Sequence, residues 1–453
     1  MSVFYTARKT IRNYANSGNI LILATMMALI IVNMPFLTEL YNSLWVHEVA
    51  LQVGDFNLFS HNGHPMTVMQ VINDALMAFF FFSVGLEIKR EVLVGELSSF
   101  RNALLPIIAA IGGMVVPVLI YRYLAQGTDY ADGWAIPMAT DIAFSLGVLA
   151  MLGNRVPIGL KVFLTTLAVV DDIGGIMVIA LFYSGHIEYT MLLWAAALLA
   201  ALFIGGRLGV QSKLFYGALG TCVWFCFLNA GIHPTIAGVL VAFTIPSKPV
   251  FAPEKYVKSI RQNISYFLSE DDDKLNSRTI LDKNQMNLLK QIETASDKVI
   301  SPLQDMEDTL HPLVNYIIVP LFAFANAGIF FGGMEISQLF SGIAPTIILA
   351  LVVGKFVGIF LFSWLTIICR LAPMPEGGNW ARMASVSMLG GIGFTVSLFI
   401  ANLSFGTNAS MAILLNDAKL GILVASILAG ILGWLLLHFS LPKEPQDDEE
   451  DED

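Results

Sequence analysis

Charged side chains are scarce in this sequence, which has 453 residues but only 13% Asp, Glu, Lys and Arg. Soluble domains carry about 25% charged residues. Because 56% of the residues are hydrophobic, the chain has more apolar surface than a soluble core can bury, and a bilayer must cover the excess. The scarcity of charge therefore excludes an ordinary soluble protein and predicts a membrane protein.

Cysteine and net basic charge are lacking as well. The three cysteines, Cys222, Cys226 and Cys369, all lie in apolar stretches. An odd number in such positions gives neither a disulfide framework nor the spacing of a zinc site, so we interpret them as packing residues. The net charge is −10, with the acids gathered in one loop and in the C-terminal tail. This distribution gives no indication of a nucleic-acid partner.

Long apolar runs occupy most of the chain. Runs of roughly 20 residues can span a bilayer as helices. We predict an all-α membrane protein with about twelve such spans, at residues 19–36, 70–88, 103–125, 134–152, 158–183, 190–206, 213–231, 233–246, 311–331, 341–370, 382–403 and 414–440. Spans 1–8 then fall in residues 1–246 and spans 9–12 in residues 309–440. No cleavage site of small residues follows the first run, which predicts an uncleaved helix.

The placement of Lys and Arg predicts the orientation of these spans. With the N-terminus inside, nearly all basic residues between the spans lie on the inner side, and Arg122 alone lies on the outer side. Basic residues accumulate in cytoplasmic loops. We therefore expect both termini in the cytoplasm.

Three segments fall outside the predicted spans. Residues 45–59 alternate around Gly54-Asp55, which indicates a short extracytoplasmic β-hairpin or an ordered loop. Residues 247–308 are charged and predict a solvated cytoplasmic loop, in which residues 280–300 could instead form an amphipathic helix on the membrane. The tail, residues 441–453, is acidic, and we expect it to be disordered.

Asp171 and Asp172 lie in the middle of the fifth span, within LAVVDDIGGI. A carboxylate at mid-membrane costs at least about 2.5–3.5 kcal/mol, so such residues usually serve transport. Adjacent helical residues point about 100° apart, and two close acids do not readily carry charge together. The pair could exchange protons for a hard cation, which prefers oxygen ligands. Two fixed ion pairs are the structural alternative, but the apolar spans hold too few basic residues for that.

Two further spans carry interruptions. Pro137 breaks the fourth span just before Thr140 and Asp141, and Asp141 could cap the next half-helix. Clustered glycines in the eleventh span, within MLGGIGFTVSLF, permit either an unwound stretch or close packing. Each interrupted helix is second of three, in spans 3–5 and in spans 10–12. An offset of seven spans gives these triplets opposite orientation, which predicts an inverted repeat whose two broken helices cross.

Lys355 is the clearest cation inside an apolar span. An isolated ammonium is costly there, so we expect it to pair with Asp171 or Asp172. Snorkelling to the interface is the alternative, but the apolar run extends on both sides of it. Lys419, close to Asp417 near a helix start, is interpreted as part of an interfacial pair.

Other titratable residues lie at span ends. Glu87 and Glu91 share one helical face at the inner end of the second span, where they form either a functional cluster or part of the ordinary charged boundary. His233 and His311 each precede a proline. Histidine titrates near neutral pH, which permits a sensing role, although a single histidine at a helix end is more often structural.

Several long motifs in this order resemble the NhaA family of Na+/H+ antiporters over nearly the whole chain. They are INDALMAFFFFSVGLEIKRE, GWAIPMATDIAF, LAVVDDIGGI, GIHPTIAG, HPLVNYIIVPLFAFANAG, VGKFVGI and GGIGFTVSLFIA. This family is itself a known example of inverted-repeat transporters, so the repeat inferred above is not independent of the resemblance.

The resemblance implies a Na+/H+ antiporter of the bacterial inner membrane, with no cofactor other than the transported Na+ or Li+ and H+. Asp172 would be the main cation and proton carrier, Asp171 would pair with Lys355, and Thr140 and Asp141 would lie where the broken helices cross. The resemblance assigns pH sensing to residues at the inner funnel and to one histidine: Glu87, Glu91, Glu307, His311 and His233. Asp74 would lie at the outer end of the second span, and the hairpin at 45–59 would form the homodimer contact.

The sequence also departs from the family pattern. Its loop before His311 is longer, Asp308 stands where a funnel histidine is found, and the tail is longer and acidic. These departures concern regulation rather than exchange. Three other functions were weighed: an intramembrane aspartyl protease using Asp141 with Asp171 or Asp172, a passive cation channel, and a transporter of anions or organic solutes. No GxGD motif occurs at these acids, and the site is too acidic for an anion.

Overall fold

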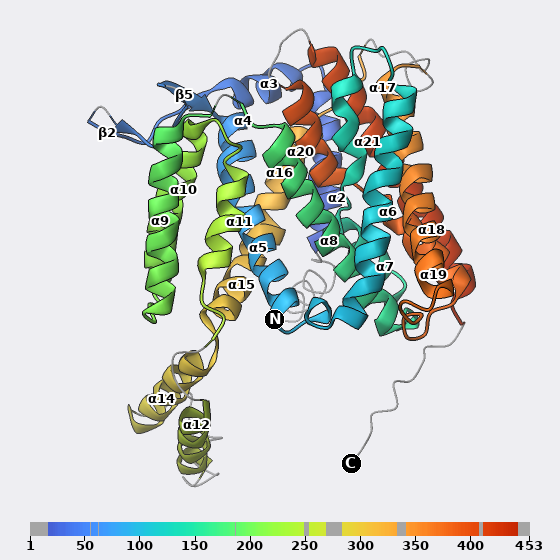
Figure 1. The fold of residues 1–453 in the computed structure, drawn as a ribbon. Helices are drawn as coiled ribbons and strands as arrows, with labels where there is room; N and C mark the ends of the chain where they lie inside the picture. Colours follow the sequence, from blue (N-terminus) through green and yellow to red (C-terminus); the bar gives the residue numbers. More distant parts are fainter. Residues whose placement is uncertain are drawn as a thin grey trace, which may run out of the picture.

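The computed structural model describes residues 17–54, 56–61, 63–185, 187–248, 253–268, 283–332, 341–406 and 411–442. Figure 1 shows a helical bundle with short β-strands at one end, whereas α12 and α14 project from the other end. The predicted acidic tail lies outside the described residues beyond position 442. The three cysteines are free thiols.

Within the described residues, seven helical stretches are long and apolar enough to cross a membrane: Val68–Leu93, Phe100–Leu124 (α6), Ile158–Phe182 (α8), Tyr189–Arg207 (α9), Pro302–Asn326, Ile343–Ile368 and Ala412–Ser440 (α21). Three shorter elements are also apolar: α2 (Ser17–Val32), α10 (Lys213–Ala230) and α11 (Thr235–Thr244). With the two bent pairs described next, these elements coincide with the predicted spans. The ninth begins nine residues before the predicted position 311, because Ser301 caps α15 (Pro302–Leu313) by accepting from the N–H of Gln304.

Two helix pairs are bent at short breaks. The 3₁₀-helix η3 (Ala131–Met138) and α7 (Ile142–Ala150) differ in direction by 41°, and α19 (Trp380–Leu389) and α20 (Phe394–Phe405) by 42°. The breaks fall where Pro137 and the glycine cluster predict them. The eleventh span is therefore unwound at its glycines, which resolves the choice between unwinding and packing alone.

Three of the long stretches contain a π-helical segment. These are η1 (Val71–Leu76) before α5 (Met77–Leu93), η5 (Val314–Ile318) before α16 (Val319–Asn326), and η7 (Leu349–Gly354) between α17 (Ile343–Ile348) and α18 (Lys355–Ile368). Segments of this kind are rare and concentrate at functional sites. Lys355 follows directly after η7.

The predicted hairpin is present, with different limits. Residues 45 and 46 still belong to α3 (Thr38–Val46), and β2 (Gln52–Val53) pairs antiparallel with β3 (Phe56–Asn57). A second small sheet has the order β1-β5-β4, formed by β1 (Glu48–Val49), β5 (His64–Thr67) and β4 (Ser60–His61). The strands thus continue beyond the predicted end at residue 59. Figure 1 places them beside the ends of α9 and α10.

The segment 247–308 differs from the predicted solvated loop. It contains α12 (Pro253–Leu268) and α14 (Lys283–Val299), which contact each other outside the bundle (Figure 1). The stretch 280–300 is thus helical, as the alternative interpretation held. Its apolar residues recur at helical spacing, and this gives α14 one face that packs on α12. Whether these helices lie on a membrane stays a prediction.

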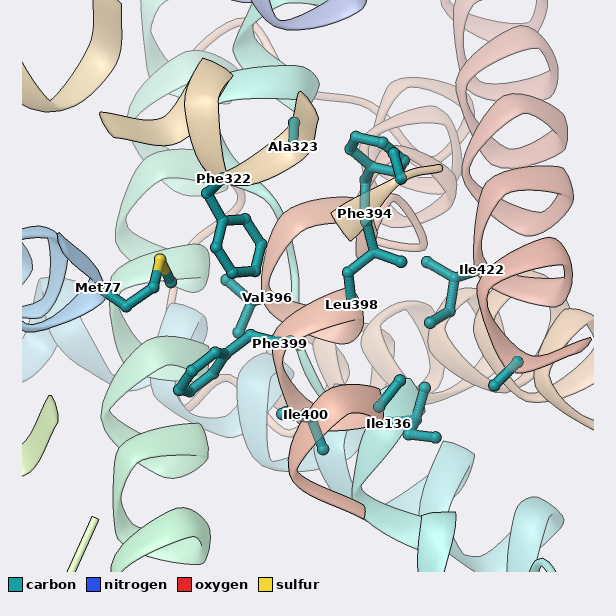
Figure 2. Packing of buried hydrophobic residues seen from close by; sticks show 14 of the residues in the cluster. Met77, Ile136, Phe322, Ala323, Phe394, Val396, Leu398, Phe399, Ile400 and Ile422 are labelled. Atoms are coloured by element: carbon teal, nitrogen blue, oxygen red, sulfur yellow. The ribbon is translucent and has the colours of Figure 1, made fainter. Parts of the chain in front are cut away.

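Close packing around α20 positions the broken helix. Phe399 on α20 lies against Phe322 on α16 and Phe81 on α5, with ring centroids 6.2 and 5.7 Å apart. Figure 2 shows Phe322 and Phe399 between neighbouring helices, with Met77 close by. The second half of the interrupted span is therefore held by apolar contacts, although its break exposes free backbone groups to the interior.

Candidate functional site

The two breaks meet in the middle of the protein. The N–H of Asp141 donates to the carbonyl of Ile392 over 2.7 Å, and the Thr140 hydroxyl donates to the carbonyl of Gly390 over 2.9 Å. These bonds satisfy backbone groups that the interrupted helices leave free, as buried polar groups require. A Cβ on Gly393 would lie 2.9 Å from the Ala139 carbonyl oxygen. A glycine is therefore needed at position 393 for the two backbone segments to approach each other.

Asp141 caps both half-helices that begin at the crossing. One carboxylate oxygen accepts from the N–H of Phe144 at the start of α7, over 3.0 Å. The other accepts from the N–H and the hydroxyl of Thr395 at the start of α20, over 3.0 and 2.6 Å. Asp141 is 2% exposed. Its negative charge thus faces the positive ends of two helix dipoles, which extends the predicted capping of one half-helix.

A buried ion pair lies beside this crossing. Lys355 forms a salt bridge with one carboxylate oxygen of Asp171, and the same oxygen accepts from the Thr140 hydroxyl over 2.6 Å. Lys355 also donates to the Thr140 hydroxyl over 2.9 Å. All three side chains are buried. Of the two partners predicted for Lys355, the structure brings Asp171 into contact with it.

Asp172 lies next to this pair but is not part of it. Its side chain is buried, and its charge interacts with the carboxylates of Asp171, Glu87 and Asp141. The Oδ1 atoms of Asp171 and Asp172 are both buried and accept no hydrogen bond from any described residue. Buried polar atoms normally have partners. Two carboxylate oxygens on adjacent residues are thus without donors, and such oxygens can accept a small cation or a proton.

Three acids gather at the end of the second span that lies away from the strands. Arg90 bridges α5 and α15, with its guanidinium 3.2 Å from Glu91 and 3.0 Å from Glu307. The charge of Glu87 interacts with the Arg90 guanidinium and with the carboxylates of Glu91 and Glu307. His311 is exposed and contacts the Asn315 amide on its own helix. The structure therefore brings the predicted acids together, but no described contact joins His311 to them.

His233 and Asp74 line a cavity of about 1240 Å³ at the opposite end, toward the strands. His233 Nε2 lies 3.7 Å from the Asp74 carboxylate, and its Nδ1 lies 2.8 Å from the Thr235 hydroxyl. Its ring contacts Phe399, with centroids 5.3 Å apart. His233 thus meets α20 about one turn beyond Thr395, and no described contact joins it to the central acids.

Comparison with known proteins agrees with this geometry. The family model for Na+/H+ antiporter 1 matches residues 8–437. The Na+/H+ antiporter NhaA of Phocaeicola vulgatus is 52% identical over 450 residues, covering 98% of each chain. The NhaA of Bacteroides fragilis strain YCH46 is 52% identical over 94% of this chain and 95% of its own, and NhaA 2 of Syntrophotalea carbinolica is 43% identical over 94% of each.

The chain belongs to the NhaA family of Na+/H+ antiporters. It is therefore a multi-span, all-helical membrane protein of a transporter family rather than an enzyme. The protease interpretation also conflicts with the structure, since both oxygens of Asp141 serve as helix caps.

Sequence reasoning missed several residues of this antiporter. Thr395 is one: it is the second residue of α20, and its hydroxyl donates to Asp141 instead of capping the helix itself. A chain of three amides is another: Asn402 donates to Asn326 over 2.9 Å, and Asn326 donates to Asn73 over 2.9 Å. These residues lie on three separate spans and have no shared motif. Arg90 is a further one, because nothing near it in the sequence indicates that it joins acids of two spans.

The interpretation of Lys419 was wrong. It is 8% exposed, buried on α21, and forms no salt bridge with Asp417 within the described chain. Asp417 and Lys419 are two positions apart. Side chains two apart on a helix point to nearly opposite sides, so these two do not face each other.

Proposed function

We propose that this protein exchanges cytoplasmic Na+ or Li+ for external H+ at Asp171 and Asp172. The observation that carries the proposal is the pair of buried carboxylate oxygens that accept no hydrogen bond from described residues. Carboxylate oxygens are suitable ligands for hard cations. A proton can occupy the same oxygens, so cation and proton compete for one site. Membership in a family of Na+/H+ antiporters supports this assignment.

Asp171 and Asp172 have different parts in the proposed exchange. Asp172 carries the cation or proton, because it has no basic partner among the described residues. Asp171 is held by Lys355 and Thr140 in this conformation and becomes available when the salt bridge opens. If both acids bind protons for each Na+ released, each cycle moves net charge. The membrane voltage then drives transport, at about 2.3 kcal/mol per charge per 100 mV.

Exchange requires a second conformation. Both central carboxylates are buried in this one, so an ion reaches them only after neighbouring helices move. The crossing suits such movement, because it is held by a few hydrogen bonds rather than by continuous helices. We therefore propose alternating access, in which the site opens first to one side and then to the other.

In this proposal, residues at the ends of the spans regulate transport and join two copies of the protein. The acids around Arg90, together with His311, would face the cytoplasm and respond to pH, with His233 contributing at the opposite end. Both termini would lie in the cytoplasm of a bacterial cell, in the inner membrane. The paired strands β2 and β3 would join two copies into a homodimer. Lipid is the only other partner expected, and nucleic acid is not.

Everted membrane vesicles that report a pH gradient with a fluorescent dye provide the test. Addition of Na+ should collapse the gradient with the intact protein, and Asp172→Asn should abolish this response. Asp129→Asn, at an exposed acid outside the spans, is the matched control and should transport normally. An unchanged response in Asp172→Asn would refute the site. A Na+ current without proton counterflow would instead indicate a passive channel.

A further inference from the structure

A second polar cavity lies beside the first half of α8, between the start of that helix and Asp171. Its volume is about 410 Å³, within the usual range for small-molecule pockets. It is lined by the first turns of α6 and α8 and by the loop that precedes α19. Along α8 it runs from Ile158 to Thr166, a distance of about 12 Å at the rise of a helix.

One end of this cavity favours an anion. The N-caps of α6 and α8, Ser99 and Pro157, make no side-chain capping bond, so the first N–H groups of both helices stay available. Two positive helix ends and Arg101 therefore meet at the mouth. Asn102 adds a neutral amide donor.

Thr166 supplies an independent indication of a ligand. Its side chain is 2% exposed and lines the cavity, yet its hydroxyl has no hydrogen-bond partner among the described residues. Its neighbour Thr165 donates to the Lys161 carbonyl over 3.0 Å. The hydroxyl oxygen is not fully enclosed by protein atoms, so it reaches the space of the cavity. An occupant of the cavity with an acceptor oxygen would provide a hydrogen-bond partner.

Two acids that line the same cavity make a simple anion an unsuitable ligand for it. Glu96 and Glu376 both line it, and neither forms a salt bridge with Arg101 or with any other described residue. Their carboxylates would repel an isolated phosphate but would bind an ammonium group close to it. The wall between them is apolar, with Leu105, Val162 and Phe163. The cavity thus offers places for a phosphate, an ammonium and a hydrocarbon chain.

We propose that this cavity binds an ethanolamine phospholipid. The phosphate lies at Arg101 and the two helix N-termini, the primary ammonium lies between Glu96 and Glu376, and an acyl chain follows the apolar wall. Phe100 and Ile158, which are 81% and 62% exposed at the mouth, face the surrounding lipid. The site holds α6, α8 and the loop before α19 together at one end of the bundle.

Native mass spectrometry of the purified full chain tests this assignment with three lipids. Phosphatidylethanolamine should be retained more strongly than phosphatidylcholine, whose quaternary ammonium donates no hydrogen bond, and more strongly than anionic phosphatidylglycerol. Arg101→Gln should weaken retention of phosphatidylethanolamine by roughly tenfold, the usual effect of one charged hydrogen bond. Thr166→Val should weaken it as well. Thr165→Val and Arg122→Gln, the latter at the other end of α6, should leave it unchanged.

Two results would overturn the proposal. Equal retention of the three lipids by the intact protein would show that the acids select no ammonium. Equal retention of phosphatidylethanolamine by Arg101→Gln and Arg122→Gln would show that the lipid binds elsewhere. Soluble phosphoethanolamine tests whether the headgroup alone is enough for binding. If it fails to displace bound lipid, the site needs the acyl chain, as proposed. Complete displacement at equal concentration would contradict a site that binds the acyl chain.

Discussion

The carboxylate of Asp141 binds both the backbone N–H and the hydroxyl of Thr395, a residue 254 positions further along the chain. The same carboxylate also caps its own helix at Phe144. One side chain therefore fixes the relative position of two half-helices from opposite halves of the sequence. This places a negative charge where two positive helix ends converge, so Asp141 has a structural role and the proposed exchange rests on Asp171 and Asp172.

Asp141→Asn should destabilise the protein by about 2 kcal/mol, because an amide provides only one acceptor atom for two helix ends. Thr395→Val, which removes only the hydroxyl bond, should cost about 1 kcal/mol. Thermal unfolding of the purified protein in detergent measures both. Asp132→Asn, at an exposed acid on the same broken span, should stay within about 0.5 kcal/mol of the parent. Equal midpoints for Asp141→Asn and Asp132→Asn would show that the cap does not hold the crossing.

Lys355→Met should lower stability by about 3–5 kcal/mol, because it leaves the Asp171 carboxylate buried without its partner. The double variant with Asp171→Asn removes both charges and should recover most of this loss. Lys213→Met is the control, since Lys213 and Asp305 form an exposed pair at 2.8 Å that is worth about 0–1 kcal/mol. A double-mutant cycle from thermal unfolding gives the coupling. No recovery in the double variant would contradict a direct charge interaction.

Much of this fold could be predicted from the sequence because apolar runs, Pro137 and the glycine cluster act locally. Lys355 could be placed near the central acids for a different reason: a buried ammonium needs an acid, and few acids are present in the spans. Local signals could not show that Thr395 joins Asp141, since the contact depends on how two half-helices cross. They also failed for Lys419, whose burial on α21 depends on how that helix packs within the bundle.

Helix formation in the segment 253–299 shows another limit. Its many charges predict a solvated loop, yet α12 and α14 form because their few apolar residues share one helical face and pack together. Composition alone does not register that spacing. The role of Arg90 between the acids could not be predicted for a similar reason, because Arg90 and Glu307 are brought together by the packing of α5 on α15.

Gly112→Ala should separate α6 from α18 and destabilise the protein. A Cβ on Gly112 would lie 2.4 Å from the Gly358 carbonyl oxygen. A Cβ on Gly358 would lie 2.2 Å from the Gly112 carbonyl oxygen. Backbone cannot yield as a flexible side chain does, so we expect a loss of about 1–3 kcal/mol and weaker transport, since Lys355 lies one turn away on α18. Gly217→Ala, with nothing within 4 Å of its Cβ, is the control and should be neutral or slightly stabilising. Unfolding midpoints and vesicle transport check both.

Replacing residues 51–58 with a Gly-Ser loop of equal length should convert a dimer into monomers. Within the described residues, β2 and β3 pair only with each other, so their outer edges are free to pair with a second copy. Leu51, 56% exposed, adds apolar surface beside them. Native mass spectrometry measures the oligomeric state, and vesicle assays should show transport by the monomer, because the central acids lie on other elements. A Gly-Ser replacement of residues 126–129 is the control and should remain dimeric. A dimer that persists without the strands would locate the contact elsewhere on the protein.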